Sequence, residues 1–247
     1  MPLTAFTNRY EIKYLVETRR IDEIKAKLSD FFEPDPYSVA DKGYYVYSIY
    51  YDSPRHKYYS EKREGQLTRI KPRLRTYLRT PEATPETFFL ELKGRHNRIV
   101  LKRREKISRD LAHALLRPSR GALSPRDLES PTLSEFLFLA ERYNLMPSVT
   151  VLYRREPFNA AFYSGLRITF DTRLQCSFLT RFNNPQHCFS EAIPFNYFVL
   201  ELKYNNKIPR LFLDRLNQLE LKQQSVSKFA VSLERCYDAL QPRRYAL

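Results

Sequence analysis

The 247-residue sequence has only five glycines, and no segment fits GxxxxGK[ST] or GxGxxG. Both patterns describe glycine-rich loops whose backbone N–H groups surround phosphate groups. Their absence excludes the phosphate loops of P-loop and Rossmann proteins. Any phosphate bound by this chain must therefore be held by side chains.

Cysteine and histidine are also scarce. The three cysteines, Cys176, Cys188 and Cys236, are odd in number and have no metal-like spacing. The four histidines form no HxxxH pair, and no Ser/His/Asp or Cys/His arrangement stands out. The histidines are therefore expected on the surface or in loops, and no nucleophilic catalytic arrangement can be argued. The sparse cysteines suit a reducing compartment.

Long apolar runs are missing as well. No stretch approaches the roughly 20 apolar residues of a membrane-spanning helix, and the first residues lack the apolar segment of a signal peptide. We therefore expect a cytoplasmic protein. Its length is compatible with one large domain over residues 1–247.

Acidic residues are outnumbered. The chain has 28 Asp and Glu against 42 Lys and Arg, a formal net charge of +14. Such an excess favours an anionic partner such as nucleic acid, a membrane surface or a phosphate compound. The hydrophobic content of 43% is that of a folded protein.

The basic residues follow a period of two in one segment. In residues 71–79, alternate positions carry Lys71, Arg73, Arg75 and Arg79, while Leu74 lies on the other face. Side chains alternate between the faces of a strand, so this strand has one cationic and one apolar face. Taken alone, the pattern is typical of a solvated strand surface.

A second pattern, Glu-x-Lys, recurs in three predicted strands. It occurs at Glu11-x-Lys13, Glu91-x-Lys93 and Glu201-x-Lys203. Each pair alone could be a cross-strand salt bridge on a solvated face. Three repeats, together with Arg73-x-Arg75, instead indicate a charged lumen that holds a polyanion and a metal ion.

Eight strands are predicted, at about residues 8–16, 43–51, 70–79, 86–95, 97–107, 147–156, 165–173 and 196–204. Amphipathic helices are predicted at about residues 18–32, 134–143, 210–222 and 227–240. The helices can cover the apolar strand faces, which would leave the charged faces inward. We therefore predict an α+β fold: an eight-stranded antiparallel barrel, or tunnel, with a charged lumen, flanked by amphipathic helices.

The ordered set of charged motifs resembles the VTC domain, the catalytic domain of the vacuolar transporter chaperone polyphosphate polymerase. That domain belongs to the triphosphate tunnel metalloenzymes, alongside the CYTH phosphatases. The resemblance runs from about residue 8 to 238. It rests on the three Glu-x-Lys pairs and on Arg73-x-Arg75, Lys102, Tyr153-x-Arg155, Arg167 and Ser227-Lys228-Phe229.

The resemblance implies a role for each matched residue. The catalytic, phosphate-holding residues would be Lys13, Arg73, Arg75, Lys93, Arg155, Arg167, Lys203 and Lys228. Lys102, Tyr153 and Ser227 would contact substrate. Glu201 would be the main ligand of Mn²⁺ or Mg²⁺, with Glu11 and Glu91 as further candidates. Because Lys102 lies at an even position, it would need a bulge or twist to face the lumen.

The implied reaction is synthesis of inorganic polyphosphate from the γ-phosphate of ATP. One departure favours it over hydrolysis: the opening Glu-x-Glu-x-Lys of CYTH enzymes is here Arg9-x-Glu11-x-Lys13. An ionised phosphate acceptor needs no general base, whereas water does. The alternatives are a triphosphatase or nucleoside-triphosphate hydrolase in the same tunnel, and a non-catalytic polyphosphate-binding module.

The expected partners are ATP or another triphosphate and polyphosphate, with a membrane-protein partner left open. Nucleic acid is not expected. The basic run at residues 102–106 has no interleaved aromatic residues for base stacking.

Overall fold

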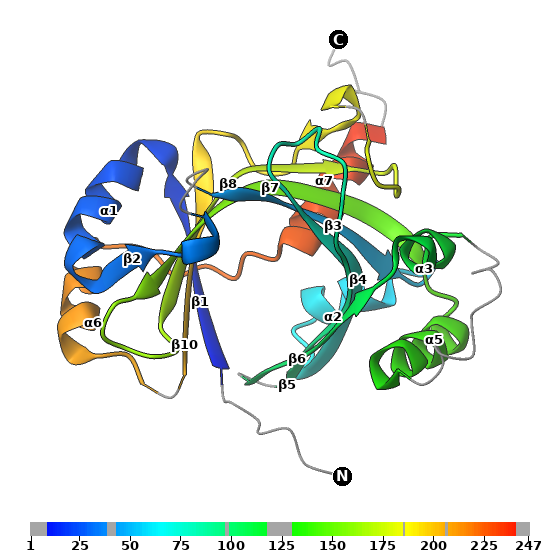
Figure 1. Cartoon of the computed structure of the whole chain (residues 1–247), viewed down its shortest axis with the longest axis horizontal. Helices are drawn as coiled ribbons and strands as arrows, with labels where there is room; N and C mark the ends of the chain where they lie inside the picture. The colour runs from blue at the N-terminus through cyan, green and yellow to red at the C-terminus, as the bar shows by residue number, and fades with distance from the viewer. Residues whose placement is uncertain are drawn as a thin grey trace.

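The computed structural model describes residues 9–38, 43–96, 99–117, 130–184, 186–205 and 207–240. Its main feature is one 10-stranded sheet that is strongly curved (Figure 1). All pairings in the sheet are antiparallel. The strand order is β1-β10-β8-β7-β3-β4-β5-β6, with β2 beside β7 and β9 beside β8.

The eight long strands confirm the predicted ones, with ends that differ by a few residues. They are β1 (Arg9–Glu17), β3 (Tyr44–Asp52), β4 (Thr68–Leu78), β5 (Phe88–His96), β6 (Ile99–Ile107), β7 (Met146–Ala160), β8 (Arg167–Ser177) and β10 (Tyr197–Asn205). Two short strands were not predicted: β2 (Phe32–Pro34) and β9 (Ser190–Glu191).

Closure of the sheet into a barrel is not confirmed. Among the described residues, no backbone ladder joins the two edge strands β1 and β6. The curvature nevertheless brings these strands near each other, and Lys93 Nζ of β5 lies 3.0 Å from Glu11 Oε2 of β1. A side-chain ion pair therefore spans the seam between the two ends of the sheet.

The helices are α1 (Ile21–Leu28), α2 (Lys57–Arg63), α3 (Arg109–Leu115), α5 (Pro131–Tyr143), α6 (Arg210–Asn217) and α7 (Lys228–Leu240). The sequence did not predict α2 and α3. The helix expected over 210–222 ends at Asn217, since Glu220 has a φ of 50°. No helix in the described part of the chain is long and apolar enough to cross a membrane.

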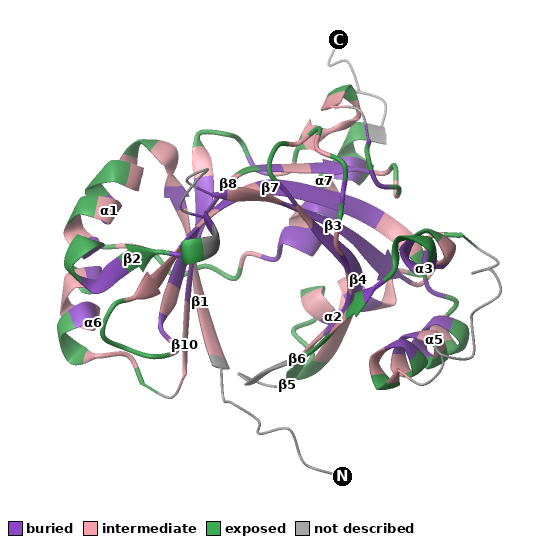
Figure 2. Cartoon of the chain, in the orientation of Figure 1, coloured by how far each residue is buried: buried purple, intermediate pink, exposed green. Residues whose placement is uncertain are grey.

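The outer face of the sheet is apolar and covered, as predicted. Leu74, Leu90, Leu200 and Leu202 are completely buried, and the central strands β3 and β8 and the middle of β7 are mostly buried in Figure 2. Helices α1 and α6 cover β1, β10 and β8, while α3 and α5 pack near β3 and β5 (Figure 1). The charged face of each strand is therefore left to the concave side.

The bulge expected at Lys102 is not present. The ladder between β5 and β6 is regular, with Lys93 opposite Lys102 and Glu91 opposite Arg104. Directly opposite residues in an antiparallel pair share a face. In this register, odd-numbered residues of β5 lie opposite even-numbered residues of β6. Lys102 thus shares the face of Lys93 without any distortion. A register shift occurs instead in β7, between Leu152 and Arg154.

Helix α7 begins on the concave side of the sheet. The Ser227 hydroxyl accepts a hydrogen bond from the backbone N–H of Ala230 at 3.3 Å, as an N-cap does. Phe229 packs against Tyr50 of β3, with ring centroids 5.1 Å apart. Lys228, the first helical residue, is thereby held among the inward-facing residues.

Candidate active site

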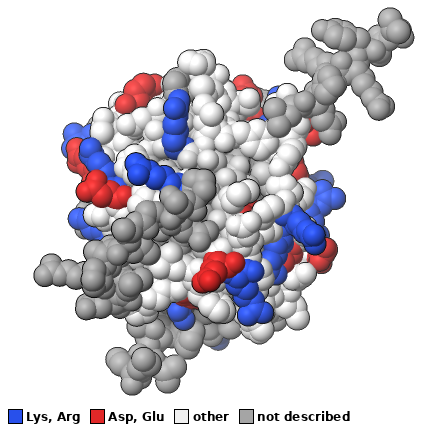
Figure 3. Space-filling view, turned by 90° about the vertical axis from the view of Figure 1, so that its right-hand side faces the viewer, with Lys and Arg blue, Asp and Glu red and all other residues white. Residues whose placement is uncertain are grey.

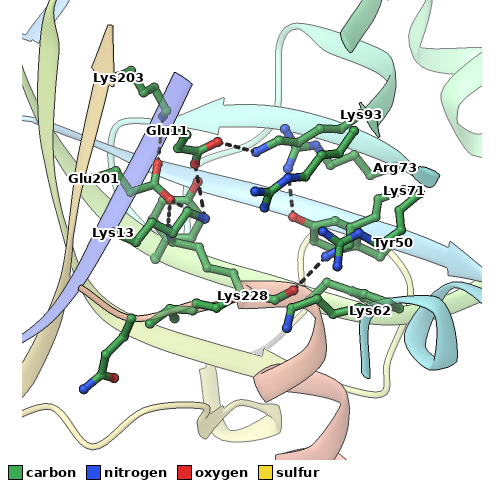
Figure 4. A pocket seen from close by; sticks show the side chains of 18 of the residues that line it. Glu11, Lys13, Tyr50, Lys62, Lys71, Arg73, Lys93, Glu201, Lys203 and Lys228 are labelled. Carbon is green, nitrogen blue, oxygen red and sulfur yellow. Dashed lines mark hydrogen bonds and ion pairs between the residues drawn. The ribbon is translucent and has the colours of Figure 1, made fainter. Parts of the chain in front are cut away.

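A cavity of about 340 Å³ lies on the concave side of the sheet (Figure 4). Strands β1, β3, β4, β5, β7 and β10 supply side chains to it, together with α2 and the segment 223–229. Among the residues that the structure describes, two carboxylates line it, Glu11 and Glu201, against eleven basic residues. The basic residues are Lys13, Lys62, Arg69, Lys71, Arg73, Arg75, Lys93, Arg95, Arg155, Lys203 and Lys228.

Strand register explains how the two carboxylates are placed. In the β1–β10 ladder, Glu11 lies opposite Lys203 and Lys13 opposite Glu201. Two Glu-x-Lys motifs on antiparallel strands therefore put each carboxylate across from an ammonium group. This opposite-charge arrangement stabilises the pairing of the two strands.

Glu201 forms ion pairs with four cations. Its Oε1 lies 2.6 Å from Lys228 Nζ and 3.0 Å from Lys13 Nζ. Its Oε2 accepts hydrogen bonds from Lys203 at 2.7 Å and from Arg155 at 3.1 Å. The carboxylate itself is almost fully buried. Glu201 is therefore the point at which β1, β7, β10 and α7 are tied together.

Asp171 of β8 contacts two of the same cations, Arg155 and Lys228. Arg155 donates two hydrogen bonds of 2.6 Å to its carboxylate, in a bidentate pair, and Lys228 Nζ lies 2.6 Å away. Asp171 is 1% exposed. We call Glu11, Glu201 and Asp171, with the cations that contact them, the carboxylate end of the site.

A separate cluster surrounds Glu91 of β5. This carboxylate is inaccessible to solvent and lies within 4 Å of four cations: Arg73 at 2.6 Å, Lys102 at 2.9 Å, Arg104 at 3.4 Å and Arg75 at 3.7 Å. Arg75 also donates to Ser48 at 3.0 Å, and Arg73 to the Tyr50 hydroxyl at 2.8 Å. Both guanidinium groups are thus oriented by neighbours beneath the cavity.

The electrostatics differ between groups in the cavity. Burial opposes ionisation of Glu201, yet Lys13, Lys203 and Lys228 hold its pKa well below the usual range. Burial lowers the pKa of Lys203 to about 7 in spite of the neighbouring Glu201. Burial and the nearby Lys93 and Lys13 lower the pKa of Lys71 well below its usual value. The site therefore stabilises negative charge and disfavours more positive charge.

Most of the residues predicted from the sequence meet in this cavity. They are Lys13, Arg73, Arg75, Lys93, Tyr153, Arg155, Lys203, Ser227 and Lys228, with Glu11 and Glu201. Figure 4 shows Glu11 and Glu201 on one side of the cavity and Arg73, Lys71 and Lys62 on the other.

Three predicted residues do not line the cavity. Arg167 donates instead toward Asp35, with Nη2 3.1 Å from Oδ2. Lys102 is engaged with Glu91 and its side chain is 40% exposed. Glu91 lies beneath the arginines, so the structure gives it an orienting contact rather than access to a metal ion.

The sequence prediction gave no site role to four basic residues that line the cavity: Lys62, Arg69, Lys71 and Arg95. Lys71 lies in the cationic alternation of residues 71–79, Arg69 extends that alternation by one position on the same face, and Arg95 extends that of Lys93. Asp171, which does not line the cavity, lies opposite Arg155 in the β7–β8 ladder and was also given no role. Lys62 carries no such signal, since it belongs to α2, which was not predicted.

Glu11 and Glu201 are the carboxylates that the cavity offers to a divalent cation. Within the described ranges, no three carboxylate, thiolate or imidazole groups gather as a ready-made metal site. Glu11 and Glu201 nevertheless share Lys13 as a partner, and the buried Oε1 of Glu11 accepts no hydrogen bond, although Lys13 Nζ lies 3.2 Å away. Mg²⁺ typically takes one or two carboxylates, with phosphate oxygens and water completing its shell. Glu11 and Glu201 fit such an ion when it arrives with phosphate.

The outer surface looks different from the cavity. On the face shown in Figure 3, basic side chains occur in small groups, interspersed with acidic ones and separated by uncharged surface. The cavity concentrates cations far more than this face does.

The model of the VTC domain family matches residues 8–237. The chain belongs to the VTC domain family. Membership supports a role in handling triphosphates or in phosphoryl transfer. Among curated proteins, no sequence matches the chain.

Solved structures similar to this VTC domain are distant. A candidate adenylate cyclase from Bacillus halodurans has 15% identity and a TM-score of 0.45, with 89% of this chain and 95% of that chain covered. A protein from Pyrococcus horikoshii has 15% identity and a TM-score of 0.46, with coverages of 92% and 99%. A candidate adenylyl cyclase from Hippeastrum, described as having a dominant triphosphatase activity, has 12% identity and a TM-score of 0.46, with coverages of 92% and 94%. Resemblance at this level says nothing about the activity of the chain.

Proposed function

We propose that this VTC domain, taken as one unit over residues 1–247, is a metal-dependent phosphotransferase. Its reaction would be the synthesis of inorganic polyphosphate from the γ-phosphate of ATP. The observation that carries the proposal is the cavity itself, with eleven basic residues and two carboxylates on one concave face. Uncompensated charges away from bulk water are costly, so such a cavity is suited to a polyanion of several charges.

The basic side chains have the chemistry that phosphoryl transfer needs. Catalysis of this reaction consists mainly of positioning and of stabilising charge on the transferred group. Arg73, Arg75 and Arg155 can bind phosphate oxygens in a bidentate manner, whereas the lysines act as point charges. The Tyr153 and Ser227 hydroxyls are further donors that line the cavity.

Glu201 and Glu11 would hold Mn²⁺ or Mg²⁺, which would supply positive charge to offset the negative charge that develops during phosphoryl transfer. The protein's own part is to keep Glu201 ionised. Although burial opposes it, the surrounding cations hold the pKa of Glu201 well below its usual range.

Two features favour a phosphate acceptor over water. Both carboxylates that line the cavity are engaged in ion pairs with lysine, so neither is an unengaged base for a water molecule. A phosphate chain end is already ionised near neutral pH and needs no base. The position that carries a glutamate in the CYTH pattern is also Arg9 here.

The test follows three products from one reaction. Purified protein is incubated with ATP and Mn²⁺, and ADP, free phosphate and acid-insoluble polymer are measured over time. We expect ADP to appear with little free phosphate while an exopolyphosphatase-sensitive polymer accumulates.

Other outcomes contradict the proposal in distinct ways. Stoichiometric free phosphate from the earliest time point, with no polymer, would indicate a triphosphatase. Tight binding of polyphosphate without turnover under any divalent metal would indicate a non-catalytic binding module.

A further inference from the structure

One end of the cavity contains cations that have no carboxylate beside them. Lys62 of α2 and Arg69 and Lys71 of β4 line this end, and we call these three residues the rim cluster. No ion pair to a carboxylate is found for any of the three among the described residues. At the carboxylate end, by contrast, Glu201 alone lies within 4 Å of four cations.

Strand register places positive charges directly opposite each other on β4 and β5. In the β4–β5 ladder, Arg69 lies directly opposite Arg95 and Lys71 opposite Lys93. Like charges at directly opposed positions destabilise a sheet. The next pair on the same face is Arg73 with Glu91, of opposite charge. Lys93 has Glu11 as an ion-pair partner, whereas Arg69 and Lys71 on β4 have no carboxylate partner among the described residues, which points to an anion from outside the chain.

The nearest acidic groups do not neutralise the cluster. Glu61 and Glu234 act on Arg69 and Lys62 from a distance, but each has a different partner. Glu61 Oε1 lies 2.5 Å from Lys57 Nζ, and Glu234 accepts a hydrogen bond from the Tyr59 hydroxyl at 2.8 Å. Burial and neighbouring cations lower the pKa values of Lys62, Arg69 and Lys71, as expected for cations that lack a counter-ion.

Lys71 connects the rim cluster to the rest of the cavity. Its Nζ donates a hydrogen bond to Ser227 Oγ at 2.8 Å, and Ser227 immediately precedes Lys228, which contacts Glu201. Figure 4 shows Lys71 and Lys62 across the cavity from Glu201. An extended anion could therefore contact both ends at once.

We infer that the rim cluster is a second anion subsite, which holds the part of an inorganic phosphate chain that extends beyond the phosphates bound at the carboxylate end. This inference deepens the proposed function and rests on it for the identity of the anion. An inorganic phosphate chain fits because it carries regularly spaced charge and no bases or sugars, and because the rim cluster offers ammonium and guanidinium groups. An RNA backbone is the competing ligand, and the test separates the two.

The experiment compares binding of three ligands without turnover. Titration calorimetry in metal-free buffer without ATP measures the affinity for tripolyphosphate, for a long polyphosphate of defined length and for single-stranded RNA. The variant is Lys62→Ala with Arg69→Ala. A matched control, Lys207→Ala with Arg215→Ala, removes the same two charges from residues that do not line the cavity.

For the rim variant, we expect long polyphosphate to bind at least about tenfold more weakly, the loss expected for charged hydrogen bonds to phosphate. The affinity for tripolyphosphate should fall much less. The control variant should lower the affinity for both phosphate ligands slightly and equally, because it weakens only a screened long-range attraction. The thermal midpoint of the rim variant should not fall, because the substitutions remove two cations that have no carboxylate partner and so relieve repulsion. A structural role for these residues would instead lower it.

The outcomes separate this inference from the proposed function. The binding experiment measures no turnover, so its result does not depend on activity. If the protein made no polymer in the turnover assay but still showed the length-dependent loss of binding, the proposed function would be overturned and the subsite supported. Equal losses for the short and the long ligand would overturn the subsite. Equally tight binding of single-stranded RNA through the same residues would also overturn it.

Discussion

The two ends of the cavity hold their cations in different ways. At the carboxylate end, Glu201 and Asp171 fix Arg155 and Lys228 through contacts of 2.6–3.1 Å. At the rim cluster, Arg69 faces Arg95, and Lys71 has a hydroxyl as its hydrogen-bond partner. The first arrangement is preorganised by buried carboxylates, whereas the three cations of the rim cluster have no carboxylate partner among the described residues. The proposed function and the inferred subsite therefore predict that the carboxylate end carries out the reaction and that the rim cluster holds the phosphate chain.

The largest effect is expected at the centre of the carboxylate end. Glu201→Gln keeps the volume and removes the charge, so metal-dependent turnover should fall more than about 100-fold, the scale seen when one key electrostatic group is lost. Phosphate binding should persist or tighten, because the cations lose an internal competitor. Turnover with Mn²⁺ and phosphate binding should be measured side by side.

Glu33→Gln is the matched control for that variant, since Glu33 is exposed in β2. Full Mn²⁺-dependent activity of Glu201→Gln would contradict the role given to Glu201.

Arg155→Ala should have the largest effect on stability. It leaves Asp171, which is 1% exposed, without its bidentate partner, and removing one member of a buried ion pair typically costs about 3–5 kcal/mol. Denaturant unfolding measures this loss. The double variant Arg155→Met with Asp171→Leu should recover much of the stability but not the turnover. If the double variant were no more stable than Arg155→Ala, the buried pair would not be the cause.

Arg75→Ala tests a phosphate contact with less effect on stability. Arg75, at 3.7 Å, is the most distant of the four cations around Glu91, so Glu91 keeps three closer ones when Arg75 is removed. Loss of a charged phosphate contact is worth about 1.5–3 kcal/mol, or about 10- to 150-fold in triphosphate binding. Calorimetry with tripolyphosphate measures it. An unchanged affinity would place the triphosphate away from β4.

The smallest effect concerns proton uptake at the rim cluster. Burial and neighbouring cations lower the pKa of Lys71 from its usual 10.5, and a bound phosphate chain should raise it again. Between the two pKa values, binding must therefore be accompanied by proton uptake. The same shift means that the unfolded chain holds more protons than the folded one in this range, so folding stability contributed by Lys71 rises with pH up to 10.5.

Calorimetry of polyphosphate binding in buffers of different ionisation enthalpy, at mildly alkaline pH, measures the uptake. Lys71→Met should reduce it. Proton release on binding, or an uptake that is identical in Lys71→Met, would show that Lys71 does not face the chain.

The same comparison shows what could be predicted from the sequence. Alternation along single strands placed Lys13, Arg73, Arg155 and Glu201 correctly on one inner face, because the period of two is a local property. The pairing of strands is not local. The regular register of β5 with β6 brings Lys102 to the inner face without a bulge, and residue number alone could not show it.

Contributions from outside the strands were the least predictable. Lys62 lines the cavity from the short helix α2, which has no long amphipathic repeat. Arg167 shared the expected parity, yet Asp35, from a segment between β2 and β3, holds it away from the cavity. Closure of the sheet depends on how β1 and β6 meet, which no pattern within one strand encodes.

The most direct test is a crystal structure with Mn²⁺ and a polyphosphate chain longer than three phosphates, with manganese located by anomalous scattering. We expect manganese beside Glu201 and Glu11, and phosphate density that extends from there to Lys71, Arg69 and Lys62. Manganese located away from both carboxylates, or phosphate density confined to the outer surface, would contradict a reaction inside this cavity.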